Sequence, residues 1–374
     1  MPELLWLARS YQRWSLLMMT YLTSSLCRNA PGHTLPVLVA CLAFLGACSK
    51  GGEGPGPVAS PAGESAVADV EAIRTADPYA RGYTDADFPR VKELAPGVFT
   101  YEQLRSAGAE RFTTVSFFVV TDQGVLVADG QGNHEETARL VATIADITDQ
   151  PITHVVVASD HGDHTAGNTA FPPGVEYVAH PTSAAALEAM AATRAEGGQA
   201  TDGQPGEPDA PFPLAMRLVD DALNLMLGGR DIRILFLGRA HTGGDLVVHL
   251  PEERIVFMSE TYLHRVFPAM RSAFPSEWAT MIEAAQALNA DVYVPGHGFV
   301  DSAEMLRAEL EIYRQAVVQV VEEGRRLHDQ GLSLEDAQAA ADFGELGEWS
   351  LSSSQIPVAV RQVYRELNGE LPAR

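Results

Sequence analysis

The chain has 374 residues, 46% of them hydrophobic and 20% charged, which is enough to bury a sizeable core in one large domain or two small ones. Its formal net charge of −23 excludes charge-driven binding to nucleic acid and argues against electrostatic docking on anionic lipid, because phosphates would be repelled. The three cysteines, Cys27, Cys41 and Cys48, leave the rest of the chain without a thiol for a metal or a disulfide.

The first 47 residues are predicted to be a targeting segment. An apolar run from Leu35 to Leu45 follows Arg28 and is shorter than the roughly 20 residues that span a bilayer. The run ends in Leu-Gly-Ala-Cys at Cys48, which resembles a bacterial lipobox, and Met18 or Met19 is an alternative start. We therefore predict a signal segment at 1–47 and an exported lipoprotein on the periplasmic face of a bacterial membrane, attached only through lipid on Cys48. The alternative is a signal cut elsewhere, with Cys48 incidental.

Residues 48–88 are predicted to be a flexible tether. The stretch from Ser49 to Asp69 is rich in Gly, Pro, Ser and Ala, a composition that cannot bury a core. About 20 such residues span on the order of 25 Å, which would hold a domain just clear of a membrane.

The remainder divides into a main domain at 89–325 and a C-terminal helical extension at 326–374. Strands are expected at 98–101, 113–120, 125–128, 153–158, 175–179, 232–237, 246–250, 255–258 and 292–294. Helices are expected at 135–147 with Asn133 as a cap, 181–194, 276–288, 303–323 and within 332–371, and a loop at 196–213. Two blocks of strands with helices between them predict an α/β (α+β) fold with two packed sheets and helices outside.

Three segments combine metal-ligand side chains with turn-like backbone. Asp160–His164 reads Asp-His-Gly-Asp-His directly after an apolar strand, His241 lies in His-Thr-Gly-Gly-Asp, and His297 lies in Pro-Gly-His-Gly. Imidazole and carboxylate are the groups that bind divalent zinc where no thiolate is available. We predict that the metal ligands are His161, Asp163, His164, His241, Glu260 and His297.

These motifs, in this order, resemble the metallo-β-lactamase fold superfamily. The resemblance covers about Val91 to Val320 and includes Ala95–Val98 and Val127–Gly130, which match the opening strands of that family. It implies an αββα sandwich in which two similar halves enclose a metal site.

The chain departs from the family pattern at two positions. The family's loop reads His-x-His-x-Asp-His. Here Ser159 stands where its first histidine would be, or that histidine has been deleted beside Asp160, and Glu260 replaces the usual bridging aspartate. The resemblance then implies one metal position at Asp163, His164, His297 and Glu260, and a weakened one at His161, His241 and Glu260. We predict one tightly held zinc and a second only at high metal concentration.

Several neighbouring side chains have open roles. Glu260 either bridges two ions or only hydrogen-bonds a ligand. Asp160 is a replacement ligand, a water-orienting base or an exposed acid, and we favour the exposed acid. Asp129 is a candidate to steady a ligand histidine, and Arg239 or Arg265 a candidate to meet an anionic substrate.

The constellation leads to three functional hypotheses. The first is a zinc-dependent hydrolase of a small-molecule ester, lactone, lactam or related bond, in which Asp163 and Glu260 are catalytic and zinc lowers the pKa of water to about 7. The second is a non-haem iron oxygenase of the persulfide dioxygenase type, because His161, His241 and Glu260 form a two-histidine, one-carboxylate set; we prefer zinc to iron. The third is a tethered, non-catalytic metal-binding protein. The sequence does not set the oligomeric state.

Overall fold

Twelve strands carry the fold, in a computed structural model that describes residues 73–195 and 216–373. The predicted signal segment, Cys48 and the loop at 196–213 lie outside these residues, all of which belong to one unit at 69–374. The strands are β1 (Arg90–Ala95), β2 (Val98–Ala107), β3 (Glu110–Thr121), β4 (Gly124–Ala128), β5 (Ile152–Val156), β6 (Glu176–Ala179), β7 (Met216–Leu218), β8 (Ala222–Leu227), β9 (Arg230–Leu235), β10 (Val247–Leu250), β11 (Ile255–Leu263) and β12 (Val292–His297).

The strands pair in the order β7-β6-β5-β4-β3-β12-β11-β10-β9-β8, with β2 also paired to β3 and β1 to β2. Pairing is parallel from β4 to β7 and between β11 and β12, and antiparallel elsewhere. The sheet is therefore mixed and curls into two layers, which confirms the predicted α/β (α+β) sandwich.

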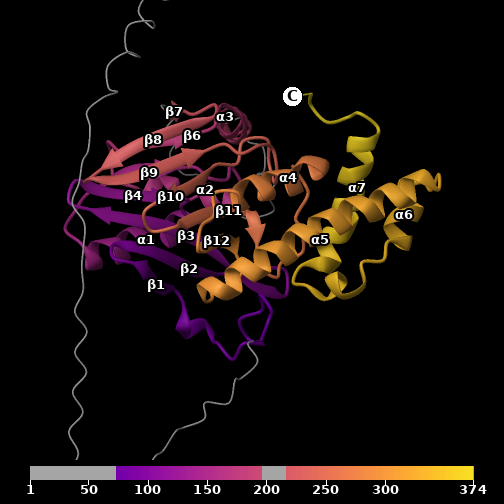
Figure 1. Cartoon of the computed structure of the whole chain (residues 1–374), viewed down its shortest axis with the longest axis horizontal. Helices are drawn as coiled ribbons and strands as arrows, with labels where there is room; N and C mark the ends of the chain where they lie inside the picture. The colour runs from indigo at the N-terminus through magenta and orange to yellow at the C-terminus, as the bar shows by residue number, and fades with distance from the viewer. Residues whose placement is uncertain (1–72, 196–215, 374) are drawn as a thin grey trace, which may run out of the picture. The chain divides into compact units, whose positions relative to one another are not determined.

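The described helices are α1 (His134–Ile147), α2 (Gly162–Thr165), α3 (Pro181–Ala195), α4 (Pro275–Gln286), α5 (Ala303–Asp329), α6 (Leu334–Ala340) and α7 (Ser352–Leu367). Figure 1 shows α5, α6 and α7 gathered on the opposite side of the view from β7 and β8. No helix among the described residues is long and apolar enough to cross a membrane.

Two buried clusters separate the faces of the sheet. Adjacent residues of β3 point to opposite faces, so Phe118 joins a cluster with Leu140 of α1, while Phe117 points between the layers. There the Phe117 ring stacks on Phe257 of β11, with centroids 5.4 Å apart. Helices α1 and α3 thus cover one layer, and α4, α5 and α7 pack against the other through the larger cluster.

The structure confirms one predicted helix boundary and shifts two other predicted boundaries. Asn133 caps α1 as predicted, and its side chain accepts a hydrogen bond from the Glu136 amide at 2.9 Å. Strand β11 continues past Met258 to Leu263, so Glu260 lies within the strand and not after it. The boundary placed between 325 and 326 falls inside α5.

The end of the predicted tether is not free of the domain. Arg81 forms a bidentate ion pair with Asp301, and the Tyr83 ring stacks on Phe299 at 5.4 Å. Arg74 pairs with Glu309 of α5 at 3.2 Å. The prediction of a flexible tether is therefore wrong for residues 73–88, because aromatic and charged side chains there find partners near the end of β12 and on α5.

Candidate metal centre

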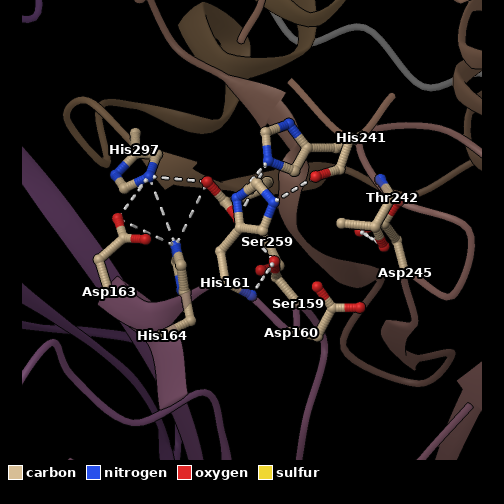
Figure 2. A network of polar contacts seen from close by, with 12 residues as sticks. Ser159, Asp160, His161, Asp163, His164, His241, Thr242, Asp245, Ser259 and His297 are labelled. Atoms are coloured by element: carbon tan, nitrogen blue, oxygen red, sulfur yellow. Dashed lines mark hydrogen bonds and ion pairs between the residues drawn. The ribbon is translucent and has the colours of Figure 1, made fainter. Parts of the chain in front are cut away.

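The six predicted ligands come from four segments that meet where several inner strands of the sheet end. His161, Asp163 and His164 lie in and before α2, directly after β5, and His241 lies between β9 and β10. Glu260 lies in β11, and His297 is the last residue of β12. Figure 2 shows the labelled histidines pointing toward one another across the two layers.

The structure sorts these side chains into two groups that share Glu260. One group is Asp163, His164, Glu260 and His297, and the other is His161, His241 and Glu260. In each group one donor atom per residue lies within 4.8 Å of all the others, which is close enough for a common cation. The structure therefore brings together all six predicted residues.

The group around His161 is the tighter of the two. His161 Nδ1 lies 2.9 Å from His241 Nε2, and Glu260 Oε2 lies 3.1 Å and 3.2 Å from these two atoms. The indole of Trp278, in α4, packs edge-on against the His241 ring at 5.3 Å and fixes its plane. These contacts point the two nitrogens and one oxygen at a single point.

The group around His297 has four donors. His297 Nε2 lies 3.4 Å from His164 Nε2 and 3.2 Å from both Asp163 Oδ2 and Glu260 Oε1. Glu260 therefore turns one carboxylate oxygen toward each group. That arrangement fits the bridging role and favours it over the alternative in which Glu260 only hydrogen-bonds one ligand.

The outer nitrogens of two histidines have partners that orient the rings. His297 Nδ1 donates to the Thr113 carbonyl at 2.9 Å, which leaves Nε2 free to face the centre. His164 Nδ1 lies 3.1 Å from Asp129 Oδ2, so Asp129 stands where the predicted supporting carboxylate would be. The sequence could not have indicated Thr113 for this role, because the contact is made by its backbone carbonyl and does not depend on the side chain.

The backbone beside the centre is strained. Asp129 and Ser259 have φ angles of 61° and 48°, in the left-handed region that non-glycine residues rarely adopt. The Asp129 carboxylate accepts bonds from the Ala158 amide at 2.8 Å and the Ser259 hydroxyl at 2.5 Å. This carboxylate ties β4 to the strand that carries Glu260 and to the start of the loop that carries His161.

Ser159 is fully buried at the position of the absent histidine. Its hydroxyl donates to Glu260 Oε2 at 2.5 Å and accepts from the His161 amide at 3.3 Å. Ser159 thus holds the carboxylate that faces His161 and His241, and it supplies no nitrogen to that group.

The charges of the centre depend on one another. Burial acts to lower the pKa of His297, but its hydrogen bonds to the Asp163 and Glu260 carboxylates overcome this effect and raise that pKa to about 10. Burial also acts to lower the pKa of His161, but the Glu260 carboxylate outweighs it and raises that pKa to about 9. Burial lowers the pKa of His241 to about 4, and the surrounding histidines hold the pKa of Glu260 well below its usual range despite burial.

These groups fit a bound cation. The partly buried carboxylate of Asp163 and the buried carboxylate of Glu260 favour positive charge nearby, which protons on His161 and His297 supply in the protein alone. A divalent cation would supply the same charge to neutral imidazoles, and nitrogen with carboxylate oxygen is a donor set that suits zinc or iron.

A cavity of about 320 Å³ adjoins His161. Asp160 and Gly162 line it from the ligand loop, Ala186 and Met190 from α3, and Arg271 and Ser272 from the loop before α4. Asp160 is only 7% exposed, so the expectation of an exposed acid is wrong: α3 covers it, and burial raises its pKa.

The two arginines proposed to meet an anionic substrate are both engaged elsewhere. Arg239 pairs with Glu277 and lies over the Phe274 ring at 4.0 Å, and Arg265 makes two bonds to Glu309. Sequence reasoning overlooked Arg271 and Ser272, because they lie in an irregular loop eight or more residues after the end of β11.

The fold and the two donor groups define a metal-binding protein built on a two-layered sheet. Residues 109–297 match the model of the metallo-beta-lactamase superfamily, and since the match covers half of the chain, the protein belongs to that superfamily. Membership supports an enzyme that uses a metal.

Individual relatives are distant. The chain is 22% identical over 230 residues to a metallo-beta-lactamase type 2 of Bacillus sp. (strain 170). The aligned segment covers 60% of this chain and 82% of that protein. The chain is also 22% identical over 166 residues to the 2,4-dinitroanisole O-demethylase subunit alpha of Nocardioides sp. (strain JS1661), covering 44% and 46%. A solved metallo-beta-lactamase from Pontibacter korlensis matches 59% of this chain and 97% of its own, at 20% identity and a TM-score of 0.48.

Proposed function

We propose that this protein is a metal-dependent hydrolase of small molecules, acting on an ester, lactone, lactam or related bond. The observation that carries the proposal is the position of Glu260, whose two oxygens lie against two separate sets of donors. A bound divalent cation would lower the pKa of water to about 7 and polarise the scissile carbonyl.

The roles of the protein's own groups follow from their exposure. Asp163 has a side chain that is 23% exposed, whereas Glu260 is 4% exposed, so Asp163 is the carboxylate that solvent and substrate reach. We assign Asp163 to orient a water molecule and accept its proton, and Glu260 to hold both donor groups in register. The cavity beside His161 would receive the rest of the substrate.

We propose zinc as the metal, with one ion held tightly by Asp163, His164, His297 and Glu260. The group at His161, His241 and Glu260 has one donor fewer, which supports weaker binding. Metal quantification after gentle dialysis, paired with hydrolysis of a panel of lactams, lactones, esters and 2,4-dinitroanisole, tests this. One equivalent of zinc with turnover is expected. Retained metal without turnover of any substrate would instead indicate the non-catalytic metal-binding protein, and a protein that retains no metal would refute the metal centre. Two retained equivalents would refute the ranking of the groups.

A second candidate is a non-haem iron oxygenase acting on persulfides. The observation in its favour is the separate cluster of His161, His241 and Glu260, a two-histidine, one-carboxylate set. Iron in the purified protein together with oxygen uptake on a persulfide would establish it and exclude the zinc hydrolase.

We also propose that the mature chain begins at Cys48 and is tethered by lipid to the periplasmic face of a membrane. The support is the apolar run that ends at Cys48. Mass spectrometry of the N-terminal peptide from cell membranes should find a diacylated or triacylated Cys48, and Cys48→Ser should release the protein to the soluble fraction. An unmodified N-terminus at another residue would contradict this.

A further inference from the structure

The C-terminal part of the chain lies outside the matched family region, yet it contacts the wall of the cavity. The match ends at residue 297, before α5 begins. Residues 265–274, here named the pocket loop, join β11 to α4. One side of this loop faces the candidate centre: Arg271 and Ser272 line the cavity, and Ser272 Oγ lies 3.4 Å from His161 Nε2.

The start of the pocket loop is held by the segment that precedes α7. The Phe267 amide donates to the Ser350 carbonyl at 2.9 Å, and the Ser350 amide donates to the Arg265 carbonyl at 3.3 Å. The Arg265 guanidinium lies over the Trp349 ring at 5.0 Å. These contacts anchor the loop at the end away from the cavity.

The end of the pocket loop is held by α7 itself. Gln362 is 3% exposed, and its side-chain amide donates to the Ala273 carbonyl at 2.7 Å, one residue from Ser272. Glu366, one turn further on, accepts from the amide and hydroxyl of Ser276 in the first turn of α4. Arg365 in turn donates to the Gln362 side-chain oxygen at 3.1 Å.

These contacts set the position of the cavity wall. Residues 267–274 form no helix or strand, so the regular ladders of the sheet do not fix their path. Without the Gln362 amide, the buried Ala273 carbonyl would lack a donor and pay the cost of desolvation, and the loop would then relax to find another partner. The backbone next to Ser272 therefore depends on a side chain of α7.

We propose that the C-terminal extension positions the pocket loop through Gln362 and thereby selects which substrates reach the metal centre. This rests on the proposed hydrolase function. Gln362 is a positioning residue, since its described contacts are with Ala273 and Arg365 and with none of the six candidate ligands.

The test compares Gln362→Met with Gln355→Met, which makes the same change on α7 at a side chain without a described partner. Gln362→Met is expected to keep its metal, to raise KM for the bulkier members of the substrate panel roughly 3- to 10-fold, and to leave kcat on the smallest nearly unchanged. Gln355→Met should match the wild type. Equal KM values for the two variants, or a fall in kcat that follows metal loss, would overturn the proposal.

Hydrogen exchange of the pocket-loop amides provides a readout that needs no turnover. Exchange at the amides of 269–274 should be faster in Gln362→Met than in Gln355→Met, and equal exchange overturns the positioning role even if the wild type proves inactive. Wild-type protein without metal or turnover would instead refute the hydrolase proposal. If Gln362→Met fails to fold, Glu366→Ala serves, because it frees the same end of the loop from a more exposed position.

Discussion

Glu260 and Ser159 are the two residues at which this chain departs from the expected family pattern, and their side chains are hydrogen-bonded to each other. Glu260 Oε2 accepts from Ser159 and faces His161 and His241, while Oε1 faces His297. The longer glutamate thus reaches both donor groups, and the serine holds it in place.

We expect Glu260→Gln to weaken metal binding far more than Ser159→Ala. The first change removes the negative charge shared by both groups and should lower metal affinity by roughly 100-fold or more, while the second removes one supporting hydrogen bond and should cost about 10-fold. Titration against a chromogenic chelator measures both. Similar losses in the two variants would show that Glu260 is not a ligand.

Glu102 provides a prediction of stability against pH, away from the centre. Burial raises the pKa of this carboxyl to about 7, although Arg90 lies 3.0 Å away. A carboxyl with a raised pKa in the folded state contributes stability below its ordinary value near 4.5, and that contribution is lost as pH rises through about 7.

Glu102→Gln should therefore be more stable than the wild type at pH 8, by on the order of 1–3 kcal/mol, and nearly equal to it at pH 4.5. Denaturant unfolding at the two pH values measures the difference. A gap that is the same at both would contradict the raised pKa.

At the scale of elements, β11 and β12 approach each other closely where Glu260 and His297 meet. A Cβ on Gly296 would lie 2.4 Å from the Ser259 carbonyl carbon and 2.7 Å from the Glu260 amide. Only a residue without a side chain permits this contact between backbones.

Gly296→Ala should push the two strands apart and displace both ligands, so we expect a loss of at least about 2 kcal/mol of stability together with weaker metal binding. The matched control is Gly347→Ala, where an added Cβ has open space. Thermal unfolding and metal titration measure the effects, and equal behaviour of the two variants would refute the argument.

The elements that sequence patterns missed share a physical cause. Strand β7 has only three residues, and β1 and β8 have six each, in which exposed residues alternate with partly buried ones. Because β7 and β8 also end the sheet, each of them has a paired strand on one side only. Helix α2 has four residues, too few for a 3.6-residue period to register. Long periodic segments such as α1 and α5 were found in nearly their true positions.

At the scale of the whole molecule, the centre joins both layers of the sheet. His164 and Asp163 come from the layer with β5, and Glu260 and His297 from the layer with β11 and β12. A cation held by both layers would bind the folded state and not the unfolded chain, and so would stabilise the fold.

Removal of metal with a chelator should lower the melting temperature by roughly 5–15 °C, because saturation at about 1,000 times Kd stabilises a protein by about 4 kcal/mol. Re-addition of zinc should restore it, and magnesium, which prefers oxygen ligands, should not. Calorimetry before and after chelation makes the measurement; an unchanged melting temperature would mean that the centre holds no structural cation.

The sequence by itself determined the class of fold, the six candidate ligands and the departure at Ser159. Those features are local, since apolar periodicity and turn residues are written in neighbouring positions. Only the tertiary structure decided that Glu260 faces both donor groups, that Asp160 is buried and that Arg239 and Arg265 are occupied. It alone placed Gln362 behind the pocket loop, because contacts between segments about 90 residues apart depend on how the layers pack and leave no local pattern.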